Sequence, residues 1–569
     1  MSRSARSFAG VLAGLVLVGC ATVPTSGPVE RQTAQATGMN SGVHVDPLPP
    51  ADGSSQLLVV EGFLHAMSVY QPDYHVARQY LTDAANHAWH PESGVQVYGD
   101  GFPPTEYDQT VILQAPLTGM VNAAGSYKPG PGSGQSHNFS LMNIGGEWRI
   151  SNPPDGLLVS RYVFTTNFTP ISLYFLDPSG TALVPDPRFF ASGDQAMAQA
   201  VTELLAGPSS WLAPAVRKFD TSGITVGGVS VDANGLADVA LGGAADRLSA
   251  EQRHTLLTEL AYTLSGFDQV GSVRVTGAGQ VWRDEAGQSE VRADSFASLS
   301  PQGVTNRVLF LVKDHKLQRL RDPSNWNDFT VVDAGLGRPE QIAVNGDLSQ
   351  VAAVTGGGTR LELGQPNAGK PARPVRTGSG LLRPAFARNG ELWSPSSSGA
   401  TQLQVFKGEQ RLKVRVAGLP SGRVRAMALA ADGSRVAFVL REGQADVVGL
   451  ARVLRSEGAI VVDGWRTVDL ALNTGNAASY LDLGWISPTE LGVLVTSNGD
   501  TSVVRASQDG ATASDIGPSE ASALNQLAVA PAAGSPAVAL GSSGSVYRFD
   551  GEFNWNLAIT AVDAVAYSG

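Results

Sequence analysis

A strand-turn-strand theme recurs through the last half of the chain and constrains its fold more than any other feature. It reads "QIAVNGDLSQVAAVTG", "RPAFARNGELWSPS", "RAMALAADGSRVAFVLR", "LGWISPTELGVLVTS" and "QLAVAPAAGSPAVALGS". The turn glycines Gly346, Gly390 and Gly433 are 44 and 43 residues apart, and Thr489 and Gly534 follow at 56 and 45. Repeats of 40 to 50 residues that hold about four strands are typical of β-propeller blades.

Residues 299–569 are therefore expected to form a β-propeller of five or six blades. The pieces "RVLFLVKDHKLQRL" and "NLAITAVDAVAYSG" stand at the two ends of this region, and we expect them to complete one blade together. A β-sandwich is the competing fold, but it would not repeat a whole four-strand unit.

The region 166–298 mixes strands and helices. A strand "ISLYFLD" precedes a helix that stops at "LLAGP", and a hairpin follows with its turn at Asn234-Gly235. Ser249 and Gln252 have the spacing of a capping box at the start of a second helix, and the strand "GSVRVTG" ends the unit. This order resembles the GerMN module of spore-germination and sporulation proteins, which implies an α/β domain.

The region 56–165 begins with helices and continues with long strands. Apolar residues recur at helical spacing in "LLVVEGFLHAMSVY", Pro72 interrupts the pattern, and a second helix follows. Val111, Leu113, Ala115 and Leu117 then alternate along one face of a strand. A strand pair around "NIGGEW" and a terminal strand "EWRI" complete a pattern that resembles the NTF2-like α+β fold. The expected fold class is thus multidomain α+β followed by all-β.

The single cysteine of the chain, Cys20, follows a short apolar segment. Two arginines precede "FAGVLAGLVLV", which is the layout of a secretory signal peptide over residues 1–19. "LVGC" resembles the bacterial lipobox, which implies that Cys20 receives a lipid, palmitate among its acyl chains, and becomes the mature amino terminus. The alternative is an incidental cysteine in a cleaved leader.

The residues after Cys20 have the composition of a tether. Residues 21–55 are rich in Pro, Gly, Ser and Thr and show no apolar period, so we assign 20–55 to the lipidated cysteine and a flexible tether. A coil of this length spans on the order of 30 Å. No later run is apolar enough to cross a bilayer. The sequence therefore predicts a protein anchored by lipid to the extracytoplasmic face of the cell membrane.

Composition excludes some functions. Of 569 residues, 16% are charged and the formal net charge is −11, so nucleic acid is not an expected partner. No G-x-S-x-G motif occurs, and a lipidated Cys20 cannot act as a nucleophile. His87 and His90 are one residue short of the spacing that puts two ligands on one helical turn, so we expect loop histidines and no metal.

Other polar and aromatic residues are interpreted as structural. The glycine-rich pieces "GPGSGQ" and "GGGTR" lie between strands and are expected to form turns rather than phosphate sites. Asp347 and Asp432 are expected at blade turns. The aromatic residues expected in cores are Phe63, Tyr80, Trp393 and Trp485. Catalytic carboxylates that meet only in space stay an open alternative.

Taken together, the lipobox, the tether "ATVPTSGPV", the blocks "LLVVEGFLHA" and "ARQYLT", the GerMN-like module and the propeller resemble the LpqB lipoproteins of actinobacteria. The resemblance implies a non-enzymatic envelope lipoprotein without a cofactor that contacts the extracytoplasmic domain of a sensor histidine kinase. Through it, the protein would modulate the response regulator of a two-component system. The alternatives are a cell-wall glycan-binding or hydrolytic protein, and a scaffold for other envelope proteins. The sequence leaves the contacting domain, any small ligand, the sign of regulation and the oligomeric state open.

Overall fold

The structure is a computed structural model that describes residues 46–108, 110–303, 307–398, 402–470, 478–517, 523–532, 534–551 and 554–569. The chain divides into two units, Met1–Asp46 and Pro47–Gly569, and all elements below belong to the second. Cys20 and the tether up to residue 45 lie outside the described residues. In the part that is described, no helix has the length and apolarity needed to cross a membrane.

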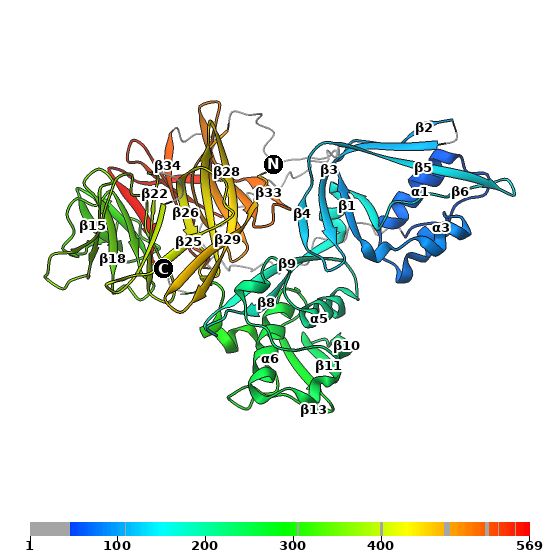
Figure 1. The fold of residues 1–569 in the computed structure, drawn as a ribbon, viewed down its shortest axis with the longest axis horizontal. Coiled ribbons are helices and arrows are strands. Elements are labelled where there is room, and N and C mark those ends of the chain that lie inside the picture. The colour runs from blue at the N-terminus through cyan, green and yellow to red at the C-terminus, as the bar shows by residue number, and fades with distance from the viewer. Residues whose placement is uncertain are drawn as a thin grey trace, which may run out of the picture. The chain divides into compact units, whose positions relative to one another are not determined.

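The first domain packs helices against one face of a curved sheet (Figure 1). Its helices are α1 (Gln56–Ser68), α2 (His75–Arg78), α3 (Asp83–Ala88) and α4 (Arg161–Asn167). Its strands are β1 (Gly94–Tyr98), β2 (Thr105–Tyr107), β3 (Thr110–Asn122), β4 (Tyr127–Pro129), β5 (Gly134–Ile144), β6 (Glu147–Ile150) and β7 (Leu157–Ser160). The sheet order is β6-β5-β3-β1-β7, with β2 and β4 added to β3. This arrangement confirms the expected α+β class.

Local sequence explains how this domain begins. The Ser55 side chain accepts a hydrogen bond from the Leu58 amide and caps α1, whose residues Phe63 and Met67 are buried. The alternating apolar residues of β3 are buried on one face, as predicted. Residues that precede α1 already contact this domain. The Tyr80 hydroxyl donates a hydrogen bond to the Leu48 carbonyl at 2.8 Å.

The second domain is the expected α/β unit. Its elements are β8 (Phe168–Leu176), β9 (Leu183–Ala191), α5 (Ala196–Ala206), β10 (Ile224–Val231), β11 (Leu236–Gly243), α6 (Ala250–Leu264), β12 (Ser272–Gly277) and β13 (Gln280–Val281). Helix α6 connects the parallel strands β11 and β12 of a sheet ordered β10-β11-β12-β13. The capping box of Ser249 and Gln252 and the turn at Gly235, with φ of 80°, are both present.

Two polar side chains of α6 supply hydrogen-bond acceptors to the edge of β8. A carboxylate oxygen of Glu259 accepts from the Leu176 amide at 3.1 Å, and the Thr263 hydroxyl accepts from the Tyr174 amide at 3.1 Å. Both side chains are buried, and burial raises the pKa of Glu259 to about 8. Helix α6 thus satisfies strand amides that would otherwise be buried without partners.

The third domain contains six sheets within the described residues, which we number as blades 1 to 6. Blade 1 consists of β14 (Leu309–Lys313), β15 (Lys316–Leu320), β16 (Phe329–Val331) and β38 (Ala564–Tyr567). Blade 2 consists of β17 (Gln341–Val344), β18 (Val351–Thr355), β19 (Arg360–Gly364) and β20 (Arg373–Thr377). Blade 3 consists of β21 (Ala385–Phe386), β22 (Glu391–Ser396), β23 (Gln402–Lys407) and β24 (Gln410–Arg411).

The remaining blades follow the same plan with one enlargement. Blade 4 holds β25 (Lys413–Val416), β26 (Arg423–Leu429), β27 (Arg435–Glu442), β28 (Ala445–Ser456) and β29 (Ala459–Thr467). Blade 5 holds β30 (Ser479–Trp485), β31 (Glu490–Ser497), β32 (Asp500–Ser507) and β33 (Ala513–Asp515). Blade 6 holds β34 (Leu524–Ala528), β35 (Val538–Gly541), β36 (Val546–Phe549) and β37 (Trp555–Ile559). The long strands β28 and β29 fall within the 56-residue interval of the repeat.

The two ends of the propeller region complete blade 1, as the sequence predicts. Strand β38 pairs antiparallel with β14, which places Tyr567 opposite Leu309. The Gly569 amide then donates to the Val344 carbonyl of blade 2 at 2.7 Å. The last residues of the chain therefore close the ring.

Neighbouring blades meet through a repeated pairing of small and larger residues on their innermost strands. The small position of blades 1 to 6 holds Ala566, Ala343, Ala385, Ala428, Gly484 and Ala528. The next position holds Tyr567, Val344, Phe386, Leu429, Trp485 and Val529. The small residue of one blade faces the larger residue of the next. A Cβ atom added to Gly484 would lie 2.4 Å from Cγ2 of Val529, and the Trp485 indole donates to the Ala428 carbonyl at 3.2 Å.

This packing predicts that Gly484→Ala destabilises the propeller by about 1–3 kcal/mol, because an overpacked core must shift to admit a methyl group. Unfolding in urea, followed by tryptophan fluorescence, measures the change. Gly378→Ala is the matched control, since its nearest neighbour would be a Leu381 methyl at 3.6 Å. The second change Val529→Ala should restore part of the loss, and equal stabilities of all variants would contradict the pairing.

Glu259 generates a pH prediction for the second domain. Its pKa is higher in the folded chain than its usual 4.5, so the folded state binds the proton more tightly. The protonated Glu259 side chain therefore contributes its full stabilisation below the pKa that it has in the unfolded chain. This contribution is lost as pH rises from about 5 to about 8, the pKa in the folded chain. Thermal unfolding of Glu259→Gln should lack this part of the pH dependence. Parallel curves for the variant and the unchanged protein would contradict the assignment.

Candidate functional site

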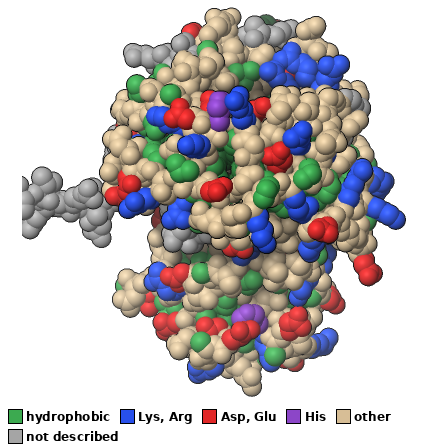
Figure 2. Space-filling view, turned by 90° about the vertical axis from the view of Figure 1, so that its left-hand side faces the viewer, with side chains coloured by type: hydrophobic (Ala, Val, Ile, Leu, Met, Phe, Trp, Pro, Cys, Tyr) green, Lys and Arg blue, Asp and Glu red, His purple; other side chains and the backbone are tan. Residues whose placement is uncertain are grey.

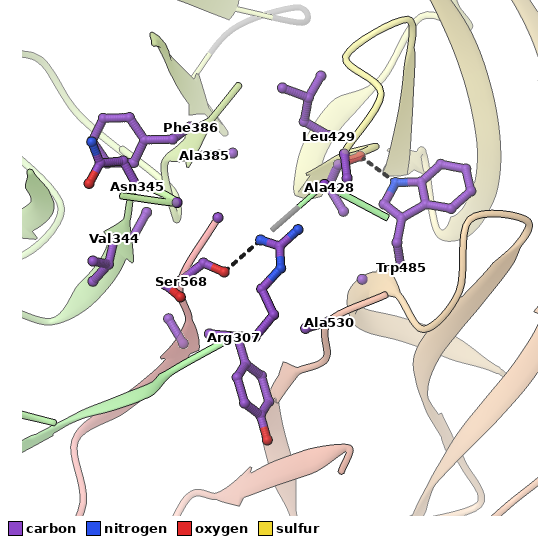
Figure 3. A pocket seen from close by; sticks show the side chains of 18 of the residues that line it. Arg307, Val344, Asn345, Ala385, Phe386, Ala428, Leu429, Trp485, Ala530 and Ser568 are labelled. Atoms are coloured by element: carbon purple, nitrogen blue, oxygen red, sulfur yellow. Dashed lines mark hydrogen bonds between the residues drawn. The ribbon is translucent and has the colours of Figure 1, made fainter. Parts of the chain in front are cut away.

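The centre of the propeller contains a cavity of about 360 Å³, which we call the channel cavity (Figure 3). All six blades contribute to it through the carboxyl-terminal ends of their innermost strands. The six small residues of the inter-blade pairing all line it, so backbone and methyl groups form most of the wall. Larger residues at these positions would fill the space.

Arg383 lines one end of this cavity and crosses the channel there. Its guanidinium donates to the Leu527 carbonyl of blade 6 at 2.8 Å and forms an ion pair with Asp482 of blade 5 at 2.5 Å. The Asp482 carboxylate also accepts from the Leu527 amide at 2.7 Å. Burial raises the pKa of Asp482, while Arg383 and the backbone donors act in the opposite direction. One side chain thereby connects blade 3 to blades 5 and 6.

A second, smaller cavity of about 70 Å³ lies on the other side of Arg383. It is lined by residues nearer the amino-terminal ends of the innermost strands, including Gln341, Arg425 and Asn525. Arg383 lines both cavities and therefore divides the channel.

Two more arginines line the channel cavity. The Arg307 guanidinium donates to the Ser568 carbonyl at 2.6 Å and to the Gln302 carbonyl at 2.9 Å, and it extends toward the middle of the cavity (Figure 3). Arg388 donates to the Ser300 carbonyl at 2.9 Å. Burial is the larger cause and repulsion from Arg388 the smaller cause that together lower the pKa of Arg307 to about 10. The group therefore stays cationic at neutral pH.

The other polar groups of the wall are engaged in turns. Asn345 accepts from the Gln350 amide and donates to Ser349, and the Asp347 carboxylate accepts from the Ser349 amide at 2.9 Å. These Ser349 hydrogen bonds lower the pKa of Asp347. Among the described residues that line the channel cavity, Asp347 provides the one side-chain carboxylate. The cavity is thus suited to holding an uncharged or anionic group rather than to acid–base exchange between paired carboxylates.

The residues singled out by sequence have clear positions. Phe63, Tyr80, Trp393 and Trp485 are buried, as expected, and Trp485 also lines the channel cavity. Asp347 lies in its predicted turn. Asp432 does as well, and in addition it forms a fully buried ion pair with Arg435, which donates to Gln508 of blade 5. The turn prediction for Asp432 therefore missed its ion pair with the arginine that contacts blade 5.

The structure also places the histidine and glycine motifs that the sequence singled out. His87 lies within α3 rather than in the expected loop, and His90 pairs with Glu92 at 3.0 Å. The described ranges contain no group of three or more His, Cys, Asp or Glu placed to hold a metal ion. In "GGGTR", the amides of Gly357 and Gly358 donate to the Glu340 carboxylate, so the turn holds an internal anion.

Sequence reasoning did not single out the arginines of the channel. Arg383 and Arg388 bracket the innermost strand of blade 3 in "RPAFAR", whereas most of the other innermost strands are bracketed by uncharged residues. Charged residues at both ends of one repeat were the available signal. The partners of these two arginines are distant in sequence, so the local pattern could not predict which residues they contact.

An α+β domain, an α/β domain and a six-bladed propeller, in that order, define a multidomain propeller protein. Family models match each part. One described as "Lipoprotein LpqB, N-terminal domain" matches residues 49–165, one described as "Sporulation and spore germination" matches 172–281, and one described as "Lipoprotein LpqB beta-propeller domain" matches 329–564. The chain belongs to the LpqB family of lipoproteins.

Relatives of the whole chain agree with this assignment. The chain is 30% identical to a "Lipoprotein LpqB" of Cutibacterium acnes over 97% of both chains. It is 28% identical to one of Streptomyces avermitilis over 100% of this chain and 98% of the other. Among solved structures, a nidogen/laminin complex covers 46% of this chain with a TM-score of 0.33 and 13% identity.

Arg383→Met should destabilise the propeller by about 3 kcal/mol, because it leaves the Asp482 carboxylate buried without its cation. The midpoint of urea unfolding reports the loss. Arg360→Gln is the matched control, since Arg360 is exposed and its pair with Glu362 spans 3.5 Å, so the expected change is below about 1 kcal/mol. Adding Asp482→Asn should recover stability. Equal losses for the two single variants would contradict the cross-channel role.

Proposed function

We propose that this protein is a lipid-anchored lipoprotein of the extracytoplasmic face of the cell membrane that binds the sensor histidine kinase of a two-component system. Binding would alter phosphorylation of the response regulator, and no catalytic step belongs to the protein itself. The observation that carries the proposal is membership of the LpqB lipoprotein family, with a relative matched over 97% of the chain, and it is supported by the lipobox-like sequence "LVGC" that ends at Cys20.

The anchor supports a binding role on physical grounds. Two or more acyl chains are needed for stable attachment, and a lipidated amino terminus provides them. A tether that spans on the order of 30 Å then confines the folded domains near membrane receptors. Confinement raises the effective concentration of one partner for the other, so a weak contact can be well occupied.

The propeller supports a binding role as well. Arg383 and Asp482 form a contact between blades, Asp432 pairs with Arg435, and Arg307 and Arg388 donate to backbone carbonyls. These charged groups stabilise a rigid ring whose loops are available to a partner. A rigid scaffold that presents loops is a common basis for recognition.

The anchor provides the test. Cys20→Ala should release the protein from the membrane fraction, because the lipid attachment is lost, and cross-linking to the kinase in intact cells should fall at least tenfold. Immunoblots of fractionated cells and of cross-linked products measure both. Thr22→Ala, two residues after Cys20, is the matched control and should leave both readouts unchanged.

Two outcomes would overturn the proposal. One is firm membrane attachment of Cys20→Ala. The other is a response regulator whose phosphorylation is the same with and without the protein, while purified peptidoglycan captures it; that result would favour the glycan-binding alternative.

A further inference from the structure

A second hollow of about 590 Å³ lies in the propeller where blade 6 meets blade 1, and we call it the seam groove. Its walls come from β15 and the turn after it, from β36, from the turn between β34 and β35, and from β32 of blade 5. The side chains that distinguish it are Arg307, Arg319, Arg321, Arg505, Arg548 and Trp326.

The charge of the seam groove is opposite to that of the chain. Five arginines line it, whereas Asp550 is the one acidic side chain among its described lining residues. The chain as a whole carries a formal charge of −11. A concentration of cations in one hollow of an acidic protein attracts anionic groups selectively.

Arg307 lines the channel cavity as well, but the other four groove arginines differ from the channel arginines in their partners. Arg321 and Arg505 form only long ion pairs, at 3.5 and 3.8 Å, with side chains 61% and 43% exposed. Arg319 and Arg548 form no ion pair with any residue in the described ranges. Their guanidinium groups therefore retain donors for an external carboxylate, which an arginine can bind through two parallel hydrogen bonds.

Aromatic side chains hold part of this surface in place. The Arg548 guanidinium lies 5.3 Å from the centroid of the Trp326 ring, and the Trp326 indole donates to the Pro323 carbonyl at 3.1 Å. The Tyr567 hydroxyl donates to the Pro536 carbonyl at 2.8 Å and joins the first and last blades. Tryptophan, tyrosine and arginine are the residues that contribute most often to the energetic centre of protein–protein interfaces.

We propose that the seam groove binds a short acidic segment of a partner protein. The proposal rests on the proposed function only in taking the sensor kinase as that partner. Arginines bind the carboxylates, Trp326 packs against the intervening apolar atoms, and the volume lies in the range of a small binding pocket. Figure 2 shows the side of the molecule that faces left in Figure 1, where apolar side chains form only small separate spots. Charge rather than apolar area therefore favours an acidic partner.

The test uses the full mature chain with Cys20→Ser, the purified extracytoplasmic region of the kinase, and a labelled acidic peptide, Gly-Asp-Glu-Phe-Asp-Glu-Gly. Arg319→Gln with Arg548→Gln removes two groove cations. Arg360→Gln with Arg423→Gln removes two exposed cations elsewhere on the propeller and is the matched control. Arg319→Gln alone alters only an exposed side chain and covers the case in which the double variant does not fold.

We expect the groove variant to weaken binding of the peptide and of the kinase region at least tenfold, and the control to change either by less than twofold. The same peptide with Asn and Gln in place of its acids should not compete. Binding to the unchanged protein should also fall as salt rises, since exposed charge pairs are screened.

Other outcomes separate the two proposals. If the kinase region binds all variants equally and the peptide binds none, the seam groove is refuted while the proposed function stands. If the kinase region binds no variant but the peptide binds through Arg319 and Arg548, the groove stands and the kinase is the wrong partner. If an anionic wall polymer competes and the acidic peptide does not bind, the groove recognises glycan polymer and the proposal is overturned.

Discussion

The pairing of Ala564–Tyr567 with Leu309–Lys313 is the interaction on which the propeller depends. Without it, β14 would present an unpaired edge and blade 1 would lack its innermost strand, so the ring would not be complete around the channel. Both hollows described above use this closure. Ser568 and Gly569, which follow the closing strand, line the channel cavity, and Tyr567 of that strand lines the seam groove.

Arginines serve two different purposes in this ring. Those that are fully or partly buried connect blades: Arg383 reaches Asp482, Arg435 reaches Gln508, and Arg455 pairs with Glu391 of blade 3 at 2.9 Å. Their cost of burial is offset by charged partners and backbone carbonyls. In the seam groove, the side chains of Arg321 and Arg505 are 61% and 43% exposed, and Arg319 and Arg548 form no ion pair within the described ranges. Burial and pairing thus separate arginines that maintain the fold from arginines available to a ligand.

The proposed function combines an anchor, a tether and a rigid ring. Lipid attachment at Cys20 would limit the protein to a layer near the membrane, and the propeller would offer a preformed surface there. Preformed surfaces lose little conformational freedom on binding, which suits an interaction between two membrane-confined proteins. The seam groove could make such an interaction specific, because its arginines attract anionic groups selectively.

The sequence by itself determined the order of domains, the strands of the repeat, the turn at Gly235, the capping box at Ser249 and the joining of both ends in blade 1. These features are local, or are repeated, so periodicity and turn chemistry reveal them. Only the tertiary structure decided the blade number, the contact of Arg435 with Gln508, the crossing of the channel by Arg383 and the gathering of Arg319, Arg505 and Arg548. The partners in these contacts come from different blades, and no local pattern encodes which distant residues the closed ring brings together.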